Sequence, residues 1–351
     1  MRCYRITNSD GKVWVMPTRN LRVAMALYQP SGWKGRLLKS AFPWLHWSGV
    51  VRKFAHAVVV DEELPASLKA ICEQCFPGYD LQYSLFLGTP SVHQKTTIQV
   101  YARQTILGYC KVSTKEDVAR LFDNEEVVLQ QLEQLGIKGV PHCLFNGCTD
   151  DGNHVFVQTT VKTLGSKVVH EWNEQMGMFL KELYQATSVK TLFEETDYYS
   201  NLQAVRHHAE WLCDAVDKDL YIKVVDDILQ RFEGQEVEYG VCHGDFTPWN
   251  MFEEGGRLFV FDWEYAHQTY PKGLDRYHFM TQIAIFERGM SAAGIIAEMK
   301  DASWMDRDVY LLYLVDIIAR FTLREKGNFN EGMRGCMVIW NALVEWIWQE
   351  H

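Results

Sequence analysis

Three polar side chains near two short apolar runs could act together chemically. Asp245 lies just beyond the run Val241–Cys242, and Asp262 directly follows the run Leu258–Phe261. Asn250 lies five residues beyond Asp245, so one compact loop can direct both side chains into a single cleft. An Asp that accepts a hydroxyl proton, together with an Asn and a second Asp that bind metal ions, is the set of groups that phosphoryl transfer from a nucleotide requires.

The types of these side chains also indicate which metal they would hold. Mg²⁺ prefers hard oxygen ligands and usually takes one or two carboxylates from a protein. We therefore expect Asn250 and Asp262 to be metal ligands, and Asp245 to be the base or orienter of an acceptor hydroxyl. His243 lies two residues before Asp245, and we expect it to brace the loop rather than to take part in the chemistry.

The positions of these residues depend on strand ends and turns. The two apolar runs predict buried strand ends, and Glu253–Gly256 predicts the turn of a hairpin between them. In the alternative interpretation, His243–Asp245 is a simple turn and Asp262 is a surface strand end. The functional interpretation is favoured because four elements agree in order and spacing.

The order His243-x-Asp245, then Asn250, then Asp262-Trp263-Glu264-Tyr265 resembles the aminoglycoside phosphotransferase and choline kinase branch of the protein-kinase-like fold. The resemblance covers roughly residues 81–350. It implies an α+β, bilobal fold, in which a small antiparallel β-sheet N-lobe with one helix precedes a mainly α C-lobe. It also implies ATP and Mg²⁺ as cofactors. The reaction would transfer the γ-phosphoryl group to a hydroxyl of a small acceptor such as a sugar, an amino alcohol or an aminoglycoside.

Hydrophobic periodicity places a candidate ion pair in the N-lobe. Apolar residues recur at helical spacing along residues 114–135 and put Glu125 on the buried face. A buried carboxylate needs a partner, and Lys111 at the end of the preceding predicted strand is the natural one. Glu126 is the more exposed alternative. The resemblance implies that Lys111 holds the nucleotide phosphates and that Glu125 is its partner.

The resemblance assigns three further roles, each with a simpler alternative. The turn after Gly88 would cover the nucleotide phosphates, but with a single glycine it is also an ordinary hairpin turn. Backbone groups near Thr160 would contact the adenine. Asp275 would brace the catalytic loop, or it is the N-terminal cap of a helix.

The chain divides on this basis into an N-terminal extension, 1–80, an N-lobe, 81–160, and a C-lobe with the catalytic and metal loops, 161–351. Residues 1–60 carry ten Lys or Arg against a single Asp. Between Trp33 and Phe54 the basic residues are interleaved with aromatic ones, a composition seen in segments at a membrane surface. We expect this segment to dock on the rest of the chain, and peripheral membrane contact is the alternative.

Composition limits the remaining possibilities. The net charge of −10 argues against nucleic acid as a partner. The sequence has neither the run of roughly 20 apolar residues that a membrane helix needs nor a signal-peptide pattern, so we expect a cytoplasmic protein. Nine scattered cysteines indicate reduced thiols; zinc held by the pairs Cys72/Cys75 and Cys143/Cys148 is the alternative. A nucleotide-binding pseudokinase or a membrane-surface adaptor is the alternative function.

Overall fold

The computed structural model describes residues 1–8, 11–29, 33–89 and 91–350, without the side chains at positions 33 and 34. Within this part, the chain divides into two compact units. Each unit is built from three segments of the chain. Unit 1 comprises Met1–Gln134, Lys138–Lys167 and Glu253–Phe259, and unit 2 comprises Leu135–Ile137, Val168–Phe252 and Val260–His351.

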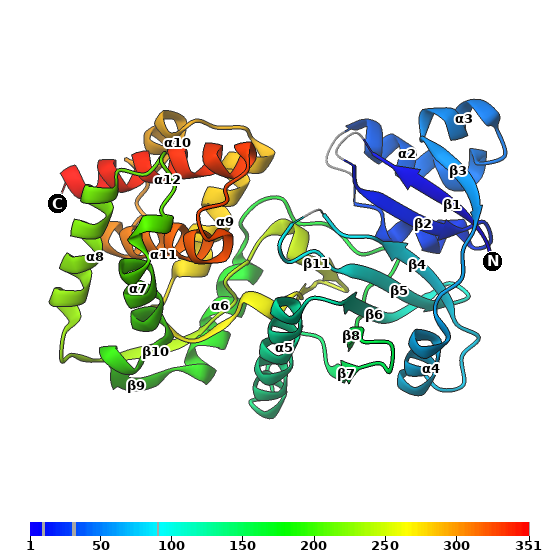
Figure 1. Cartoon of the computed structure of the whole chain (residues 1–351), viewed down its shortest axis with the longest axis horizontal. Helices are drawn as coiled ribbons and strands as arrows, with labels where there is room; N and C mark the ends of the chain where they lie inside the picture. Colours follow the sequence, from blue (N-terminus) through cyan, green and yellow to red (C-terminus); the bar gives the residue numbers. More distant parts are fainter. Residues whose placement is uncertain (9–10, 30–32, 90, 351) are drawn as a thin grey trace. The chain divides into compact units, whose positions relative to one another are not determined.

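Unit 1 is built on an eight-stranded antiparallel sheet with the strand order β3-β1-β2-β4-β5-β6-β8-β7 (Figure 1). β2, β5 and β8 are buried along most of their length, whereas buried and partly buried side chains alternate in the first half of β6. The strands are β1 (Arg2–Thr7), β2 (Val13–Pro17), β3 (Ala57–Asp61), β4 (Gln82–Phe86), β5 (Thr96–Ala102), β6 (Thr105–Ser113), β7 (Cys143–Cys148) and β8 (His154–Thr159).

The strands that we expected in an N-terminal extension belong to the same sheet as those of the expected N-lobe. β2 pairs with β4, so that Trp14 lies opposite Phe86, and the two rings stack with centroids 5.1 Å apart. The short helix α1 (Leu21–Ala24) and the helix α2 (Trp33–Leu45) add Val23 and Phe42 to a core that also contains Tyr101 of β5. The helix α3 (Gly49–Phe54) follows and leads into β3.

Two further helices, α5 and α4, complete unit 1. In α5 (Glu116–Gln134) the inward-facing positions are the predicted apolar ones, including Val118, Phe122 and Leu132. In α4 (Ala66–Cys75), Leu68 and Cys72 pack in a second core under the sheet.

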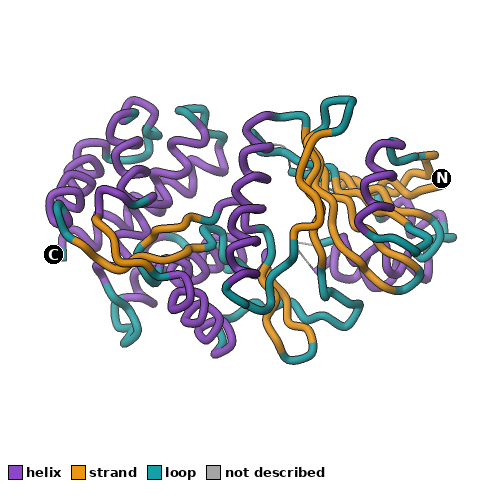
Figure 2. The backbone as a smooth tube through the Cα atoms, turned by 90° about the horizontal axis from the view of Figure 1, so that it is seen from below, coloured by secondary structure: helices purple, strands orange, loops and turns teal. Residues whose placement is uncertain are grey.

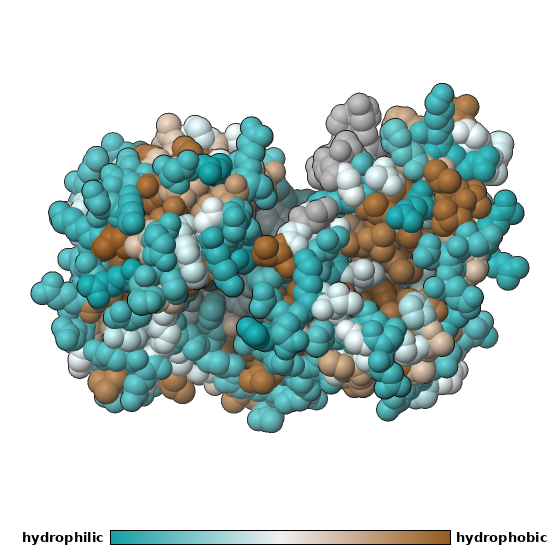
Figure 3. Space-filling model, in the orientation of Figure 1, coloured by the Kyte–Doolittle hydropathy of each residue, from teal (hydrophilic) through white to brown (hydrophobic). Residues whose placement is uncertain are grey.

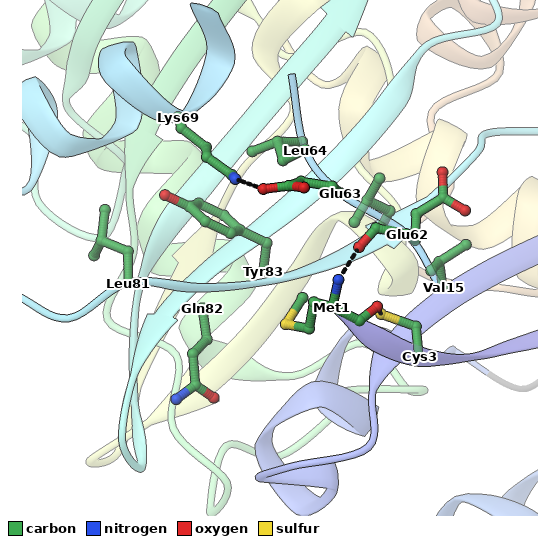
Figure 4. A pocket seen from close by; sticks show the side chains of 11 residues that line it. Met1, Cys3, Val15, Glu62, Glu63, Leu64, Lys69, Leu81, Gln82 and Tyr83 are labelled. Atoms are coloured by element: carbon green, nitrogen blue, oxygen red, sulfur yellow. Dashed lines mark hydrogen bonds and ion pairs between the residues drawn. The ribbon is translucent and has the colours of Figure 1, made fainter. Parts of the chain in front are cut away.

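A pocket of about 190 Å³ lies between β1, β2, β4 and the start of α4 (Figure 4). The amino terminus of Met1 donates to the carbonyl oxygen of Glu62 across 2.9 Å, and Lys69 forms an ion pair with Glu63 at its side. None of the site residues expected from the sequence lines this pocket. Its volume is also below the roughly 300 Å³ at which small-molecule sites begin.

Unit 2 is mainly helical, as expected for the C-lobe. The helix α11 (Arg307–Glu325) is buried from Tyr310 to Ala319, and Trp340 packs in the same core. The helices are α6 (Glu174–Thr187), α7 (Asp197–His207), α8 (Lys218–Phe232), α9 (Leu274–Gln282), α10 (Ala292–Met299), α11 (Arg307–Glu325) and α12 (Glu331–Gln349). None of the helices in the described residues has the length and hydropathy of a membrane span.

A small sheet in the order β13-β10-β9 carries the loop that holds the catalytic candidates. Its strands are β9 (Val189–Leu192), β10 (Glu236–Cys242) and β13 (His267–Tyr270). The predicted hairpin is also present, as β11 (Met251–Glu254) and β12 (Arg257–Val260). Figure 2 shows strands predominating around the N-terminus of the chain and helices around its C-terminus. This is the α+β, bilobal composition expected from the sequence.

Candidate active site

The loop after β10 brings Asp245 and Asn250 together. A 3₁₀ turn, Pro248–Asn250, folds the loop back so that the Asn250 side chain reaches Asp245. Asn250 Nδ2 donates to Asp245 Oδ2 at 2.8 Å and to the Asp245 carbonyl oxygen at 3.0 Å. The proximity predicted from the five-residue spacing is therefore present in the structure.

The other oxygen of the Asp245 carboxylate contacts His278 on α9. His278 Nε2 donates to Asp245 Oδ1 at 3.0 Å, and the imidazole is buried. Partial burial alone would raise the pKa of the Asp245 carboxyl, but the hydrogen bond and the electrostatic attraction of His278 outweigh it, so the pKa lies below its ordinary value. Asp245 is thus an ionised carboxylate at neutral pH with both oxygens held in fixed directions.

His243 connects the catalytic loop to the segment that precedes Asp262. Its Nε2 donates to the carbonyl oxygen of Phe261 at 3.1 Å, while its Nδ1 accepts from the backbone N–H of Asp245 at 3.2 Å. Burial lowers the pKa of this imidazole. A neutral ring with one donor and one acceptor satisfies both contacts, so His243 holds the loop in place, as we expected.

Asp275 fixes the same loop from α9. Its carboxylate accepts hydrogen bonds from the backbone N–H groups of His243, at 2.8 Å, and Gly244, at 3.0 Å. The N-cap position of α9 is occupied by Gly273, which decides between the two interpretations of Asp275 in favour of the brace. On the other side, Arg320 Nη1 donates to the carbonyl oxygen of Gly244 at 2.6 Å.

Gly244 occupies a position that no other residue would fill without strain. Its φ is +78°, and a Cβ atom there would lie 2.2 Å from the carbonyl oxygen of Tyr265. Both the left-handed backbone and the close approach therefore require glycine. The sequence His243-Gly244-Asp245 is thus determined by the geometry of the loop as well as by its chemistry.

Asp262 follows β12 in a left-handed backbone conformation with φ of 69°, which a non-glycine residue adopts infrequently and often at functional sites. The backbone N–H of Phe261 donates to the carbonyl oxygen of Asn250 at 2.9 Å, and this bond fixes the residue before Asp262 beside the loop. Because the Asn250 NH₂ is directed at Asp245, its amide oxygen faces away from that carboxylate. Carboxylate and amide oxygens form a donor set that fits Mg²⁺.

Unit 1 contains the predicted ion pair. Lys111 Nζ on β6 lies 2.5 Å from Glu125 Oε2 on α5, and both side chains are buried. Lys111 Nζ also lies 5.4 Å from the centre of the Phe156 ring. The alternative partner, Glu126, instead accepts a hydrogen bond from Asn146. The helical spacing of the apolar residues therefore predicted correctly that Glu125, rather than Glu126, is the partner of Lys111.

Gly88 and Thr160 have local structural roles in unit 1. Gly88 has φ of +77°, and a Cβ atom would lie 2.2 Å from the Lys95 carbonyl oxygen, so the turn itself requires glycine. Thr160 Oγ1 accepts from the backbone N–H of Lys162 just after β8. Pro90, in the turn expected to cover the phosphates, lies outside the described residues. These contacts neither require nor contradict nucleotide binding.

The sequence model of the phosphotransferase enzyme family (APH) matches residues 101–271, which include Lys111, Glu125, Asp245, Asn250 and Asp262. The predicted family resemblance is confirmed. No curated protein sequence matches this chain.

Solved structures of phosphotransferases share the fold of this chain. A thermostable mutant of aminoglycoside phosphotransferase APH(4)-Ia, in its apo form, has a TM-score of 0.52 at 14% identity, covering 80% of this chain and 98% of that one. Amicoumacin kinase hAmiN, in complex with AMP-PNP, Ca²⁺ and Ami, has a TM-score of 0.51 at 12% identity, with 82% and 94% covered. At this identity the likeness establishes the kinase-like fold.

Two residues that sequence reasoning missed hold the loop of Asp245 and the turn after Gly88 in place. His278 lies three residues after Asp275 on α9, so both are on one face of the helix, and that spacing was the available signal. Lys115 Nζ donates to the carbonyl oxygens of Ser91 and Val92 at 2.9 and 3.0 Å and so holds the turn after Gly88. No local pattern in the sequence indicates the contacts of Lys115.

The zinc alternative for the cysteines receives no support. In the described part of the chain, no cysteine belongs to a group of three or more potential ligands whose ligand atoms lie within 4.8 Å of one another. All nine thiols are free, and burial raises the pKa of Cys75 to about 11. This cysteine is therefore a protonated thiol at neutral pH.

The buried pair Lys111–Glu125 gives a prediction for stability. Glu125→Gln leaves the Lys111 ammonium buried without its 2.5 Å carboxylate, and removing one partner of a buried ion pair costs about 3–5 kcal/mol. The double variant Lys111→Met/Glu125→Leu removes both charges and should recover most of this loss. Chemical denaturation of the three proteins measures the difference. A single variant as stable as the parent would contradict the prediction.

The contact between His278 and Asp245 gives a prediction for activity. His278→Phe removes the donor at 3.0 Å but keeps an aromatic ring against Tyr313. One oxygen of the Asp245 carboxylate is then no longer fixed, although Asn250 still holds the other. Loss of orientation of a reacting group costs up to about 100-fold in rate, and we expect phosphoryl transfer to fall by roughly that factor while ATP affinity is kept. His278→Gln, which retains a donor, should lose less. Equal losses in both variants would show that the hydrogen bond is unimportant.

Proposed function

We propose that the protein is an ATP-dependent phosphotransferase that, with Mg²⁺, transfers the γ-phosphoryl group to a hydroxyl of a small acceptor. The observation that carries the proposal is the fixed position of Asp245, whose carboxylate is held by Asn250 and His278 and has a lowered pKa. Asp275 and His243 fix the backbone of the same loop. Such rigid positioning suits a reaction in which catalysis is mainly orientation and charge stabilisation.

In this proposal, Asp245 orients the acceptor hydroxyl and takes its proton as the oxygen attacks the γ-phosphorus. A carboxylate oxygen has two lone pairs, so each Asp245 oxygen can accept the hydroxyl hydrogen while it keeps its present hydrogen bond. The lowered pKa makes Asp245 a weak base, so orientation contributes more than proton abstraction before transfer. Asn250 and Asp262 would hold Mg²⁺, which, when bound, neutralises the developing charge on the phosphates.

Unit 1 would bind the nucleotide. Lys111, positioned by Glu125, would contact the phosphates, the turn after Gly88 would cover them, and backbone groups near Thr160 would contact the adenine. Two structural neighbours support nucleotide use. Amicoumacin kinase hAmiN was solved with AMP-PNP and Ca²⁺, and a mutant of aminoglycoside phosphotransferase APH(4)-Ia was solved with ADP and hygromycin B at a TM-score of 0.51.

The structure changes what can be proposed for the acceptor. The run Asp262–Tyr265 combines aromatic and acidic side chains, a composition that would suit a quaternary ammonium such as choline. Trp263 is fully buried, its ring 4.5 Å from that of His243, and its Nε1 donates to the carbonyl oxygen of Val260. Trp263 therefore packs against His243 and has no exposed ring face on which a cation could stack. We therefore propose a hydroxylated small molecule such as a sugar, an amino alcohol or an aminoglycoside, without preference for a choline-like group.

The test is a screen of hydroxylated acceptors with the purified full chain, Mg²⁺ and ATP, in which ADP release is coupled to a detector. The proposal expects acceptor-dependent ADP release that also requires Mg²⁺. Asp245→Asn protein serves as the control for contaminating kinases. ATP binding without metal, and no phosphorylated acceptor, would instead favour a nucleotide-binding pseudokinase. Because ATP is made available to enzymes in the cytoplasm, a cytoplasmic location is part of the proposal.

A further inference from the structure

An unusual share of the exposed apolar surface lies on α2, α3 and the start of β3. Seven of the 21 large hydrophobic side chains that are exposed in the described residues fall between positions 37 and 58. No tryptophan outside this segment is exposed in the described residues. Figure 3 shows hydrophobic side chains reaching the surface of unit 1 on the face drawn. We call these seven side chains the α2–α3 surface; they are Leu37, Trp44, Leu45, Trp47, Val50, Phe54 and Val58.

The α2–α3 surface is separate from the face that anchors these helices. In α2, Leu38 and Phe42 point into the core of unit 1. Leu37 and Trp44 are seven residues apart and therefore share a second, outward face. Trp47 Nε1 donates to the carbonyl oxygen of Trp44 at 3.2 Å, which fixes the turn between the two helices. The exposed tryptophans are thus held on an ordered scaffold.

The helix α3 extends the same exposed apolar surface. Val50 and Phe54 are four residues apart and lie on one face of the helix, with 80% and 52% of their surfaces exposed. No side chain of α3 is fully buried. In a globular protein a concentration of exposed apolar side chains on neighbouring helices is typical of an interaction site.

The charges around this surface indicate the partner. Residues 11–60 contain eight Lys or Arg and no Asp or Glu, although the whole chain has a net charge of −10. Arg36 and Lys53 are exposed beside the apolar side chains, and Arg52 is partly exposed. A symmetric dimer through this surface would bring two basic patches together, which is unfavourable. Tryptophan, aliphatic and basic side chains on one helical surface are instead the composition of proteins that bind anionic bilayers.

We propose that the α2–α3 surface binds an anionic lipid bilayer. Trp44, Trp47, Val50 and Phe54 would enter the interfacial layer, and Arg36, Arg52 and Lys53 would contact the negatively charged headgroups. The attachment is peripheral, because it uses side chains on the surface of unit 1. The proposal rests on the exposure and charge of this segment. It does not depend on the proposed phosphotransferase activity.

The test is flotation of the full-length protein with vesicles of phosphatidylcholine containing phosphatidylglycerol, beside vesicles of phosphatidylcholine alone. We expect binding to the anionic vesicles that weakens with salt. Arg52→Glu/Lys53→Glu should weaken it at least tenfold, because each basic residue near an anionic surface contributes roughly fivefold. Trp44→Ser/Trp47→Ser should weaken binding to a similar extent while a thermal melt shows that the protein is still folded.

Matched controls replace exposed residues elsewhere in the chain by Ser or by Glu in the same way. These are Met178→Ser/Val338→Ser for the apolar pair and Lys181→Glu/Lys300→Glu for the basic pair, and both proteins should bind vesicles like the parent. Absence of binding to anionic vesicles, or binding that is equal in the tryptophan variant and its control, would overturn the proposal. A dimer in analytical ultracentrifugation that Trp44→Ser/Trp47→Ser dissociates, without vesicle binding, would assign the surface to a second copy of the chain and also overturn it.

Discussion

Asp245→Asn is expected to abolish phosphoryl transfer while ATP affinity is retained. The substitution keeps the size of the side chain, and its amide oxygen can still accept the hydrogen bond from His278 Nε2 that Asp245 Oδ1 accepts at 3.0 Å. It removes the negative charge that orients the acceptor hydroxyl. General-base catalysis contributes on the order of 100- to 10,000-fold, and the loss of orientation adds to this, so a loss of at least this size is expected. Calorimetry with ATP and an acceptor phosphorylation assay on the same preparation measure the two effects.

The two measurements also separate the possible roles of Asp245. A variant that transfers phosphate at the parental rate would show that the loop after β10 has been misinterpreted. A variant that loses ATP affinity in parallel with transfer would move Asp245 from the acceptor to the nucleotide. Thermal melting of the variant checks that its loop and fold are intact.

Asp262→Ala is expected to abolish Mg²⁺-dependent ATP binding or turnover without unfolding the protein. Asp262 is only partly buried and lies at the end of β12, so it would contribute charge to a metal site rather than packing to a core. Asp tolerates the left-handed backbone at this position, with φ of 69°, better than Ala does, so the thermal melt also checks for a small loss of stability. Calorimetry with ATP in the presence and absence of Mg²⁺, beside a thermal melt, measures the effect.

Asp227→Ala is the matched control, because Asp227 is an exposed carboxylate on α8. It should bind Mg²⁺ and ATP like the parent protein. Near-normal turnover by folded Asp262→Ala protein would exclude Asp262 as the metal ligand. An equal loss in both variants would show that the effect comes from overall charge rather than from the site.

The local parts of the candidate site could be predicted from the sequence because their geometry is set by short spacings. Asn250 lies only five positions beyond Asp245, which allows only a compact loop, and the two side chains are hydrogen-bonded in the structure. The helical period of α5 placed Glu125 on the buried face, where it meets Lys111. In both cases a repeat or a turn decides the direction of the side chain.

The long-range parts could not be predicted in this way. β2 pairs with β4 although an intervening strand and several helices separate them, so that residues 1–80 complete the sheet. Residue type also did not predict which aromatic side chains are buried. Trp263 is fully buried, whereas Trp44 and Trp47 are 69% and 72% exposed. A sequence shows which side chains are apolar, but not how much partner surface the folded chain can offer to each of them.

The sequence alone therefore determined the resemblance to the phosphotransferase family, the mixed α+β composition and the short-range contacts of the loop, because these depend on residue type, order and spacing. Only the tertiary structure decided which groups support Asp245. Asp275 and His278 come from a helix about 30 residues further along the chain, and their contacts depend on how α9 packs against the loop. Non-local packing is set by the shape and burial of the whole unit, and no short stretch of the chain contains that information.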